Sequence, residues 1–284
     1  MATPLKRVLM RRPGPSLLGA SADDWHYGAD FDAERAISQY TVFAGLIEDS
    51  GAEVHWLRDE DDGLADAMFT HDPSLVTDDG AILLRMGKAR REAEPSLHGR
   101  VYEALDIPIL GRIEAPGQVE GGDCIWVDET MLAVGRGVRT NQAGIEQLQA
   151  MLEPKGVIVR GYDLPLWQGF GACLHLMSIM SPLAEKLALV HAPLFPVAFW
   201  RLLEERGYRL LEAPLDEFEQ SNGLNLNVLP IRPSDLIMVD GFPKTKALME
   251  AAGCTVSTFK ADALCIACEG GPTCLTRPIL RVTT

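Results

Sequence analysis

The chain has 284 residues, 47% of them hydrophobic and 23% charged, an ordinary globular mixture that can bury a sizeable core. A formal net charge of −14 argues against nucleic-acid binding, because a nucleic-acid groove needs a basic surface. No stretch approaches the roughly 18 apolar residues of a membrane span, and the first residues lack the apolar core of a signal peptide. The six cysteines are too few in a chain of this length for a disulfide scaffold, and we expect them to be free thiols in a reducing compartment. These features predict a cytoplasmic protein with no nucleic-acid or membrane partner.

Short apolar runs typical of strands recur along the whole chain. They lie at residues 7–10, 52–57, 81–86, 124–127, 131–135, 156–161, 187–192, 225–231, 235–241 and 254–259. Helical segments, with apolar residues at i, i+3 and i+4 spacing and a glycine at the end, lie at residues 32–51, 141–156, 196–207 and 243–253. This alternation predicts an α/β or α+β fold of repeated helix-plus-strand units. No linker or low-complexity tract divides the chain, so we expect a single domain over residues 1–284.

Two acidic islands stand at predicted turns beside strands, where functional residues tend to lie. Asp72 precedes Pro73, which disfavours the helical conformation and can hold the carboxylate at the start of a strand. Glu120 and Asp123 flank two glycines, whose small size lets the backbone approach other groups closely. Two carboxylates so near each other can bind a cation or work as acid and base. The alternative is that they are solvated acids of ordinary turns.

Two further islands carry cationic or titratable side chains. Arg139 opens a predicted helix and can clamp a substrate carboxylate, and Arg90 and Arg91 admit the same interpretation. Pairing with surface acids is the alternative for all three. His175 lies among apolar and small residues. It can titrate near neutrality as an acid–base group, or it can be a hydrogen-bonded histidine of the core.

A cysteine near the C-terminus is the candidate nucleophile. Gly270 and Gly271 stand shortly before Cys274 and build a tight turn that can present its thiol to a cleft. A buried, inert cysteine is the alternative. Cys265 and Cys268 form a CxxC pair, but further zinc ligands are absent at a matching spacing, so we predict no metal.

Taken in this order, the five islands resemble the motifs of the guanidino-group-modifying enzymes of the pentein superfamily. The family pattern is F-x-x-D, E-[AG]-G-D, R-T-N, L-H-L and G-G-x-x-C, which here occupies residues 69–72, 120–123, 139–141, 174–176 and 270–274. Within the superfamily the chain is most similar to bacterial dimethylarginine dimethylaminohydrolases, through its length and the strings RIEAPGQVEGGD, RTNQAG and GFPKT.

The resemblance implies a pentein α/β propeller, in which five ββαβ-type modules surround a pseudo-fivefold axis and the active site lies in the central channel. It implies no metal and no organic cofactor. By the same resemblance Cys274 is the nucleophile, His175 is the proton shuttle, and Glu120 holds the guanidinium and orients His175. The substrate-binding residues that it implies are Asp72, Asp123, Arg139 and Arg90 or Arg91.

The implied reaction is hydrolysis at the guanidinium carbon of an arginine derivative, giving citrulline and an amine through a covalent cysteine thiouronium. Arginine deiminases carry an acid two residues after the histidine, where this chain has Met177, and this favours the dimethylarginine-type enzymes. The latter carry an acid where this chain has His71. An arginine deiminase or dihydrolase, an amidinotransferase and a non-catalytic pentein that binds a partner are the alternatives. The implied partner is a small-molecule guanidino substrate, and a homodimer is compatible with the sequence.

Overall fold

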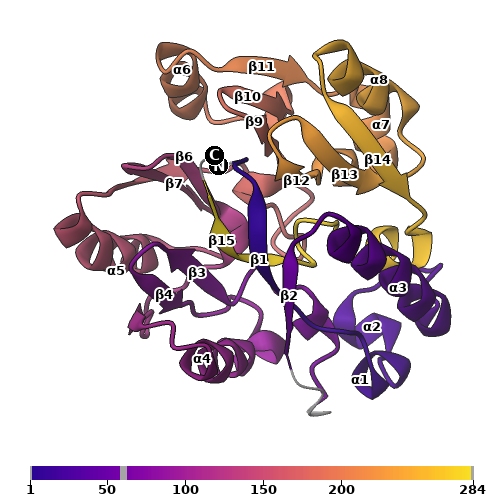
Figure 1. Cartoon of the computed structure of the whole chain (residues 1–284), viewed down its shortest axis with the longest axis horizontal. Coiled ribbons are helices and arrows are strands. Elements are labelled where there is room, and N and C mark those ends of the chain that lie inside the picture. The colour runs from indigo at the N-terminus through magenta and orange to yellow at the C-terminus, as the bar shows by residue number, and fades with distance from the viewer. Residues whose placement is uncertain (1, 58–62, 283–284) are drawn as a thin grey trace. The chain divides into compact units, whose positions relative to one another are not determined.

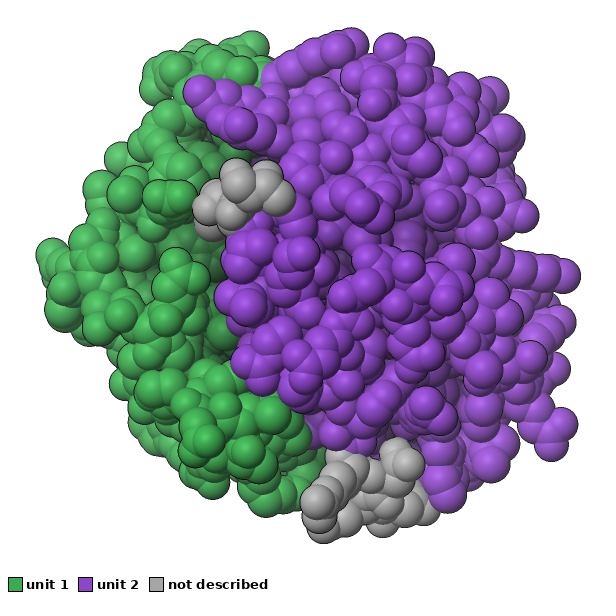
Figure 2. Space-filling view, in the orientation of Figure 1, with its two compact units in different colours: residues 1, 71–179, 192–208 green, residues 2–70, 180–191, 209–284 purple. Residues whose placement is uncertain are grey.

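The structure is a computed structural model that describes residues 2–57 and 63–282. The chain forms two compact units, coloured separately in Figure 2. Unit 1 contains His71–Ile179 and Ala192–Tyr208, and unit 2 contains Ala2–Thr70, Met180–His191 and Arg209–Thr284. The single domain expected over residues 1–284 stays a prediction.

The strands of the described residues form five sheets that share one pattern. Each has three strands, of which the central one pairs antiparallel with one neighbour and parallel with the other. In every case a helix lies in the chain between the two parallel strands, as a parallel crossover requires. The prediction of an α/β fold built from repeated units is confirmed.

Unit 1 carries two of these sheets. Their strands are β3 (Ser74–Thr77), β4 (Gly80–Leu83), β5 (Ile109–Arg112), β6 (Cys124–Asp128), β7 (Met131–Arg136) and β8 (Ile158–Asp163). Its helices are α4 (Glu94–Ala104), α5 (Gln142–Leu152) and α6 (Val197–Glu205). Its short 3-10 turns are η2 (Ala89–Arg91), η3 (Gly121–Asp123), η4 (Glu153–Lys155), η5 (Leu176–Ser178) and η6 (Ala192–Leu194).

Unit 2 carries the other three sheets. Their strands are β1 (Leu5–Met10), β2 (Glu53–Trp56), β9 (Met180–Ala184), β10 (Leu187–Val190), β11 (Arg209–Glu212), β12 (Leu229–Arg232), β13 (Asp235–Val239), β14 (Thr255–Phe259) and β15 (Arg277–Arg281). Its helices are α1 (Pro15–Leu18), α2 (Ala22–Trp25), α3 (Ala33–Asp49), α7 (Leu215–Ser221) and α8 (Pro243–Ala251). Its shorter turns are η1 (Ala65–Met68), η7 (Leu224–Leu226) and the π-helical η8 (Asp262–Ile266). The last strand, β15, lies beside the first, β1 (Figure 1).

The core of unit 1 fixes the strand ends from which its functional side chains extend. Leu132 and Val134 of β7 share one buried apolar cluster with Ile145 and Leu148 of α5. Burial of each such side chain contributes roughly 1.5–3 kcal/mol, so α5 and β7 are held firmly against each other. Among the described residues, no helix combines the length and the apolarity needed to cross a membrane.

Backbone hydrogen bonds join three loops at the edge of this core. The amide of Val119 donates to the carbonyl of Arg85 at 3.0 Å. The side-chain Oδ1 of Asn141, the N-cap of α5, accepts hydrogen bonds from the backbone amides of Gly144 at 2.9 Å and Gln118 at 3.1 Å. Two of the predicted functional islands, residues 120–123 and 139–141, therefore adjoin one hydrogen-bonded framework.

Gly144 marks the closest contact of this framework. A Cβ atom at this position would lie 2.3 Å from the carbonyl oxygen of Gln118, although the residue is inside α5. Gly45, inside α3, has nothing within 4 Å of the equivalent point. The two helical glycines therefore differ in whether another segment occupies the space of a side chain.

We expect opposite effects of alanine at these two positions. Gly45→Ala should raise the free energy of unfolding by about 0.5–1 kcal/mol, because it reduces backbone entropy only. Gly144→Ala should lower it by about 1–3 kcal/mol, because the added methyl group displaces the loop at Gln118. Urea denaturation of both variants and wild type measures the difference. A neutral or stabilising Gly144→Ala would contradict the close contact.

Candidate active site

Five of the predicted site residues form one group in unit 1, here called the acid–histidine cluster: Asp72, Glu120, Asp123, Arg139 and His175. Each comes from a loop or a short turn beside a strand. The three acids are almost fully buried, with 4%, 1% and 0% of their surfaces exposed for Asp72, Glu120 and Asp123. Buried carboxylates are costly unless their charges and lone pairs are satisfied, so the partners of each acid decide what the cluster can do.

Glu120 and His175 form the central pair of the cluster. Oε2 of Glu120 lies 2.8 Å from Nε2 of His175. Its Oε1 accepts hydrogen bonds from the amide of Gly87 at 2.8 Å and from Lys88 at 3.3 Å, and Nη1 of Arg139 is 3.5 Å away. The carboxylate is therefore surrounded by donors and cations.

The electrostatics favour an ion pair between these two residues. Burial raises the pKa of Glu120, but the hydrogen bond and the charge of His175 outweigh it and the pKa lies below its usual value. Burial lowers the pKa of His175, yet Cys173, Asp123 and the hydrogen bond to Glu120 raise it well above its usual value. Both shifts favour a Glu120 carboxylate paired with a His175 imidazolium, which can release a proton to a bound reactant.

A glycine makes room for the imidazole. A Cβ atom on Gly122 would lie 2.4 Å from Nδ1 of His175. The amide of Gly122 also donates to Oδ1 of Asp72 at 3.0 Å. The double glycine between Glu120 and Asp123 therefore lets the backbone approach the histidine and the first acid together, as the sequence indicated.

Asp72 is paired with a buried arginine. Nη1 of Arg91 donates to its Oδ2 at 2.7 Å, and the same guanidinium binds Glu94 through Nε at 2.9 Å and Nη2 at 2.8 Å. Although burial raises the pKa of Asp72, the charges of Arg91 and His175 hold it well below its usual value. Of the two arginines considered from the sequence, the structure brings Arg91 to the cluster, whereas Arg90 is exposed on η2.

Asp123 has a different environment. It accepts a hydrogen bond from Oγ1 of Thr140 at 2.6 Å and one from the amide of Leu176 at 3.0 Å. Burial dominates here and raises its pKa to about 6. Because Leu176 follows His175 directly and opens η5, Asp123 fixes the segment that carries the imidazole.

Cys274 lies in unit 2, in a turn that an asparagine organises. Nδ2 of Asn227 donates to its Sγ at 3.1 Å, and Oδ1 of Asn227 accepts from the amide of Thr273 at 2.9 Å. A Cβ atom on Gly271 would lie 2.4 Å from Cγ of Asn227, which explains the glycine. Cys274 is half-buried, and its sulfur is held by the amide of Asn227. Sequence reasoning did not single out Asn227.

Comparison with known proteins gives a consistent result. The sequence model of the family described as "Arginine deiminase" matches residues 61–195. The chain is 29% identical over 253 residues to a dimethylarginine dimethylaminohydrolase of Streptomyces coelicolor, which covers 88% of each chain. The fold matches that of the dimethylarginine dimethylaminohydrolase of Pseudomonas aeruginosa in complex with citrulline, with a TM-score of 0.78, 24% identity and coverage of 98% and 100% of the two chains. It also matches the N-terminal domain of a cyanobacterial arginine dihydrolase, with a TM-score of 0.79, 20% identity and 97% coverage of both chains.

The chain is similar to the guanidino-modifying enzymes of the pentein superfamily and shares their fold. Its five three-stranded sheets are the five ββαβ-type modules that the resemblance implied. These similarities indicate an enzyme, a hydrolase of the carbon–nitrogen bonds of amidines.

The remaining cysteines of this pentein differ in their surroundings. All six lie in the described ranges and are thiols. Cys265 and Cys268 are buried, and Sγ of Cys268 contacts the carbonyl of Ala263 at 3.5 Å. Cys173, half-buried in unit 1, is different: its sulfur, an oxygen of Glu120 and a ring nitrogen of His175 all lie within 4.8 Å of one another. Sequence reasoning missed this proximity.

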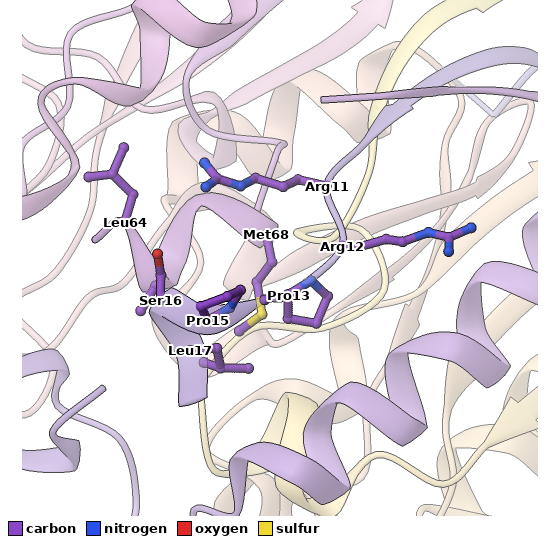
Figure 3. A pocket seen from close by; sticks show the side chains of 10 residues that line it. Arg11, Arg12, Pro13, Pro15, Ser16, Leu17, Leu64 and Met68 are labelled. Atoms are coloured by element: carbon purple, nitrogen blue, oxygen red, sulfur yellow. The ribbon is translucent and has the colours of Figure 1, made fainter. Parts of the chain in front are cut away.

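A pocket of unit 2 lies where the chain leaves β1 (Figure 3). Arg11, Leu64 and Met68 are among its lining residues. Figure 3 shows the side chains of Arg11 and Arg12 pointing in different directions, and the guanidinium of Arg12 lies 4.4 Å from the ring centre of Trp56. None of the predicted site residues lines this pocket.

The raised pKa of Asp123 predicts a characteristic pH dependence of stability. The folded chain keeps the proton up to about pH 6, whereas an unfolded aspartate releases it near pH 4. The free energy of unfolding therefore decreases as the pH rises from about 4 to about 6. The stabilising contribution of Asp123 is fully present only below about pH 4. The side chain of the Asp123→Asn variant stays neutral, so its stability lacks this pH dependence. Between pH 4 and pH 7 the free energy of unfolding of wild type should therefore fall by on the order of 2–3 kcal/mol relative to that of the variant.

Thermal unfolding of both proteins across this range measures the effect. Asp78→Asn, an exposed acid of the β3–β4 turn, is the matched control and should show no such trend. A constant difference between Asp123→Asn and wild type would show that Asp123 is already ionised at pH 4.

Proposed function

We propose that this pentein hydrolyses Nω-methylated arginine to citrulline and an amine, with Cys274 as the nucleophile. The observation that carries the proposal is the Glu120–His175 pair, in which a buried carboxylate lies 2.8 Å from an imidazole with a raised pKa. The reaction needs such a pair, because the departing amine must receive a proton and the attacking water must lose one.

The proposed reaction has two halves. In the first, the thiolate of Cys274 adds to the guanidinium carbon, and the tetrahedral adduct expels the amine as it takes the proton of His175. This leaves a thiouronium bonded to the enzyme. In the second half, neutral His175 removes a proton from water, which attacks the same carbon and expels the Cys274 thiolate. The remaining O–H proton passes to solvent, where the released amine takes up a proton, and citrulline is left. The imidazolium and the thiolate are thereby restored.

Glu120 has two roles in this proposal. It keeps His175 in the orientation and protonation state that the first half requires, which the 2.8 Å contact and the pKa directions support. Its carboxylate and that of Asp72 also bind the N–H groups of the guanidinium by charge-assisted hydrogen bonds. Asp72 already accepts from Gly122 and Arg91, and a carboxylate has further lone pairs to offer.

The other binding roles are also part of the proposal. Arg139, whose Nη1 lies 3.5 Å from Glu120, is a ligand for the α-carboxylate of the substrate. Arg90 is proposed for the same role on the basis of the resemblance, and its exposure on η2 leaves its guanidinium accessible to solvent. Asp123 is proposed to act in substrate binding through the segment of His175 that it holds.

Hydrolysis of unmodified arginine is the second candidate. The match of residues 61–195 to the arginine deiminase family and the fold shared with an arginine dihydrolase favour it. Met177 stands where deiminases carry an acid, and this favours the methylated substrate instead. An amidinotransferase, which needs an acceptor amine, and a non-catalytic binding protein are more distant alternatives, and the second of these has no use for the Glu120–His175 pair.

The decisive experiment is a citrulline and ornithine assay of the purified chain. The substrates are L-arginine, Nω-methylarginine and asymmetric dimethylarginine. We expect citrulline from the methylated compounds, and a loss of at least about 10³-fold in kcat for Cys274→Ser, as for nucleophiles of other hydrolases. The control is Cys254→Ser. Cys254 is a buried cysteine directly before β14 that takes no part in the proposed reaction, so this variant should keep the wild-type rate.

Each outcome of the assay separates the alternatives. Citrulline from arginine alone would identify a deiminase, and ornithine would identify a dihydrolase. Product that forms only after an acceptor amine is added would identify a transferase. No product under any condition, with Cys274→Ser indistinguishable from wild type, would overturn the catalytic proposal.

The Glu120–His175 contact also predicts the pH profile of the reaction. His175 must be protonated in the enzyme that meets substrate, so kcat/KM should fall at high pH as the imidazolium loses its proton. Glu120→Gln removes a contact that raises the pKa of His175, so this decrease should begin at lower pH than in wild type. Glu129→Gln, an exposed acid in the β6–β7 turn, serves as the control. An unchanged upper limit in Glu120→Gln would contradict the role of Glu120 in tuning His175.

A further inference from the structure

Glu94 is a buried acid that the proposed reaction does not use. It is the first residue of α4, and 1% of its surface is exposed. Both of its oxygens accept hydrogen bonds from Arg91: Oε1 from Nε at 2.9 Å and Oε2 from Nη2 at 2.8 Å. This is the bidentate geometry of a carboxylate on a guanidinium fork. Because a buried ion pair is often no more stabilising than apolar side chains of the same size, this one points to a role beyond stability.

Arg91 links Glu94 to an acid that is proposed to bind the substrate. Its Nη1 donates to Oδ2 of Asp72 at 2.7 Å, and all three side chains are buried. They form one unit, here called the Asp72–Arg91–Glu94 triad. Oδ1 of Asp72 is held separately by the amide of Gly122 at 3.0 Å. Since an arginine stays protonated in proteins, a permanent positive charge lies directly on the carboxylate of Asp72.

The charge of Arg91 by itself would weaken the binding of a cation. An Asp72–Arg91 pair has no net charge, and its guanidinium would repel a second guanidinium. Glu94 changes this balance, because the triad contains two carboxylates and one guanidinium and so carries an excess negative charge. In a buried site, where charges are poorly screened, such a difference of one charge acts strongly on a bound cation.

The other proposed guanidinium ligand does not supply this excess charge. The carboxylate of Glu120 lies 2.8 Å from Nε2 of His175 and 3.5 Å from Nη1 of Arg139. The raised pKa of His175 favours its charged form, so Glu120 faces two cationic partners. Glu94 therefore decides the charge balance at the Asp72 end of the site.

Helix α4 also holds the segment of Asp72 at a second point. Oγ of Ser74 lies 2.9 Å from Nδ1 of His98 and 2.7 Å from the hydroxyl of Tyr102, and all three residues are buried. Ser74 stands two residues after Asp72, and His98 stands about one helical turn after Glu94. The same helix thus contacts the chain at Asp72 through Arg91 and just beyond it through Ser74, which keeps the triad in one geometry.

We propose that Glu94 is a positioning residue that acts through Arg91, and that it makes the site selective for a cationic guanidinium over a neutral ureido group. With 1% of its surface exposed, Glu94 acts without touching the substrate. The inference rests on the proposed function for the class of ligand. It has a consequence for turnover, since the charge that attracts the substrate does not retain citrulline, which is neutral at the same end.

The test compares ligands that differ in the charge of one end only. L-Arginine, Nω-methylarginine and citrulline share the α-amine and the α-carboxylate, so the ratio of their Kd values reports on the guanidino or ureido end. Calorimetric titrations use the Cys274→Ser protein, in which the ligands are not consumed. In this background Glu94→Gln should lower the preference for the cationic ligands over citrulline at least about tenfold, since hydrogen bonds between opposite charges are the stronger ones. Glu92→Gln, a more exposed acid of the same segment that pairs with Arg85, is the matched control and should keep the ratio.

Two further variants separate a charge effect from a loss of structure. Glu94→Met, a neutral side chain of similar length, should have the same effect as Glu94→Gln, and it avoids an amide beside the fork of Arg91. The double variant Arg91→Gln/Glu94→Gln removes the guanidinium together with its partner, so Asp72 keeps an excess negative charge. A role of Glu94 through Arg91 predicts that the preference for the cationic ligands returns toward that of the parent protein. A merely structural role predicts that all three ligands bind more weakly by the same factor. Thermal unfolding establishes that each variant is folded.

Two results would overturn the inference. An unchanged ratio in the neutral Glu94 variants would show that the charge of Glu94 does not act on the ligand. A double variant without recovery would show that Glu94 does not act through Arg91.

The citrulline assay of the chain with its native Cys274 distinguishes this inference from the proposed function. A preference for cationic ligands that depends on Glu94, in a protein that forms no product, would support the inference and contradict the hydrolysis. Product formation together with an unchanged ratio would do the opposite. Failure of both cationic ligands to bind would overturn the two proposals together.

Discussion

The buried carboxylate of Glu120 is the constraint around which unit 1 is arranged. A carboxylate with 1% of its surface exposed needs compensation for the water that it has lost. That compensation comes from several segments: the amide of Gly87, the guanidinium of Arg139 and the imidazole of His175. Each is delivered by a loop that leaves a strand or precedes a short turn. The hydrogen bonds that join residues 85, 118, 119 and 141 keep these loops together without substrate.

The same balance extends to the second acid. Asp72 shares Arg91 with Glu94, so one guanidinium lies between two buried carboxylates. The charge of Arg91 lowers the pKa of Asp72. Asp123, whose donors Thr140 and Leu176 are neutral, has a raised pKa instead. Three acids of similar burial thus differ in pKa because their partners differ in charge. The acid with the raised pKa, Asp123, is also the one that accepts a hydrogen bond from the first residue of η5.

The sequence predicted the central strand of every sheet and missed only edge strands. β1, β4, β7, β10 and β13 all coincide with expected apolar runs, because a central strand is covered by neighbours on both sides. The missed strands are β3, β5, β9, β11 and β15. Several carry proline, glycine or charged residues, as in Arg277–Arg281, which edge positions tolerate and which weaken the apolar pattern.

For the site, the motifs predicted which residues gather but not which partners they have. Glu120 and His175 were expected together, and the structure places them in hydrogen-bonding contact. Asn227 and Cys173 were missed for a physical reason. Asn227 lies inside an expected strand, and Cys173 lies beside the motif at residues 174–176. Neither residue has a local sequence pattern that indicates a long-range contact. The choice of Arg91 over Arg90 likewise depends on which side of η2 faces the core, and the sequence pattern does not resolve this.

The pairing of β15 with β1 has a consequence for the order of events during translation. Strands β3–β8 and the whole acid–histidine cluster lie within residues 71–179, so they are synthesised as one continuous stretch. Cys274 stands just before β15, whose partner β1 was made first. At about 5–20 residues per second, the ribosome needs several more seconds to supply that last strand. All residues of the acid–histidine cluster are therefore present in the nascent chain before Cys274, the proposed nucleophile, has been synthesised.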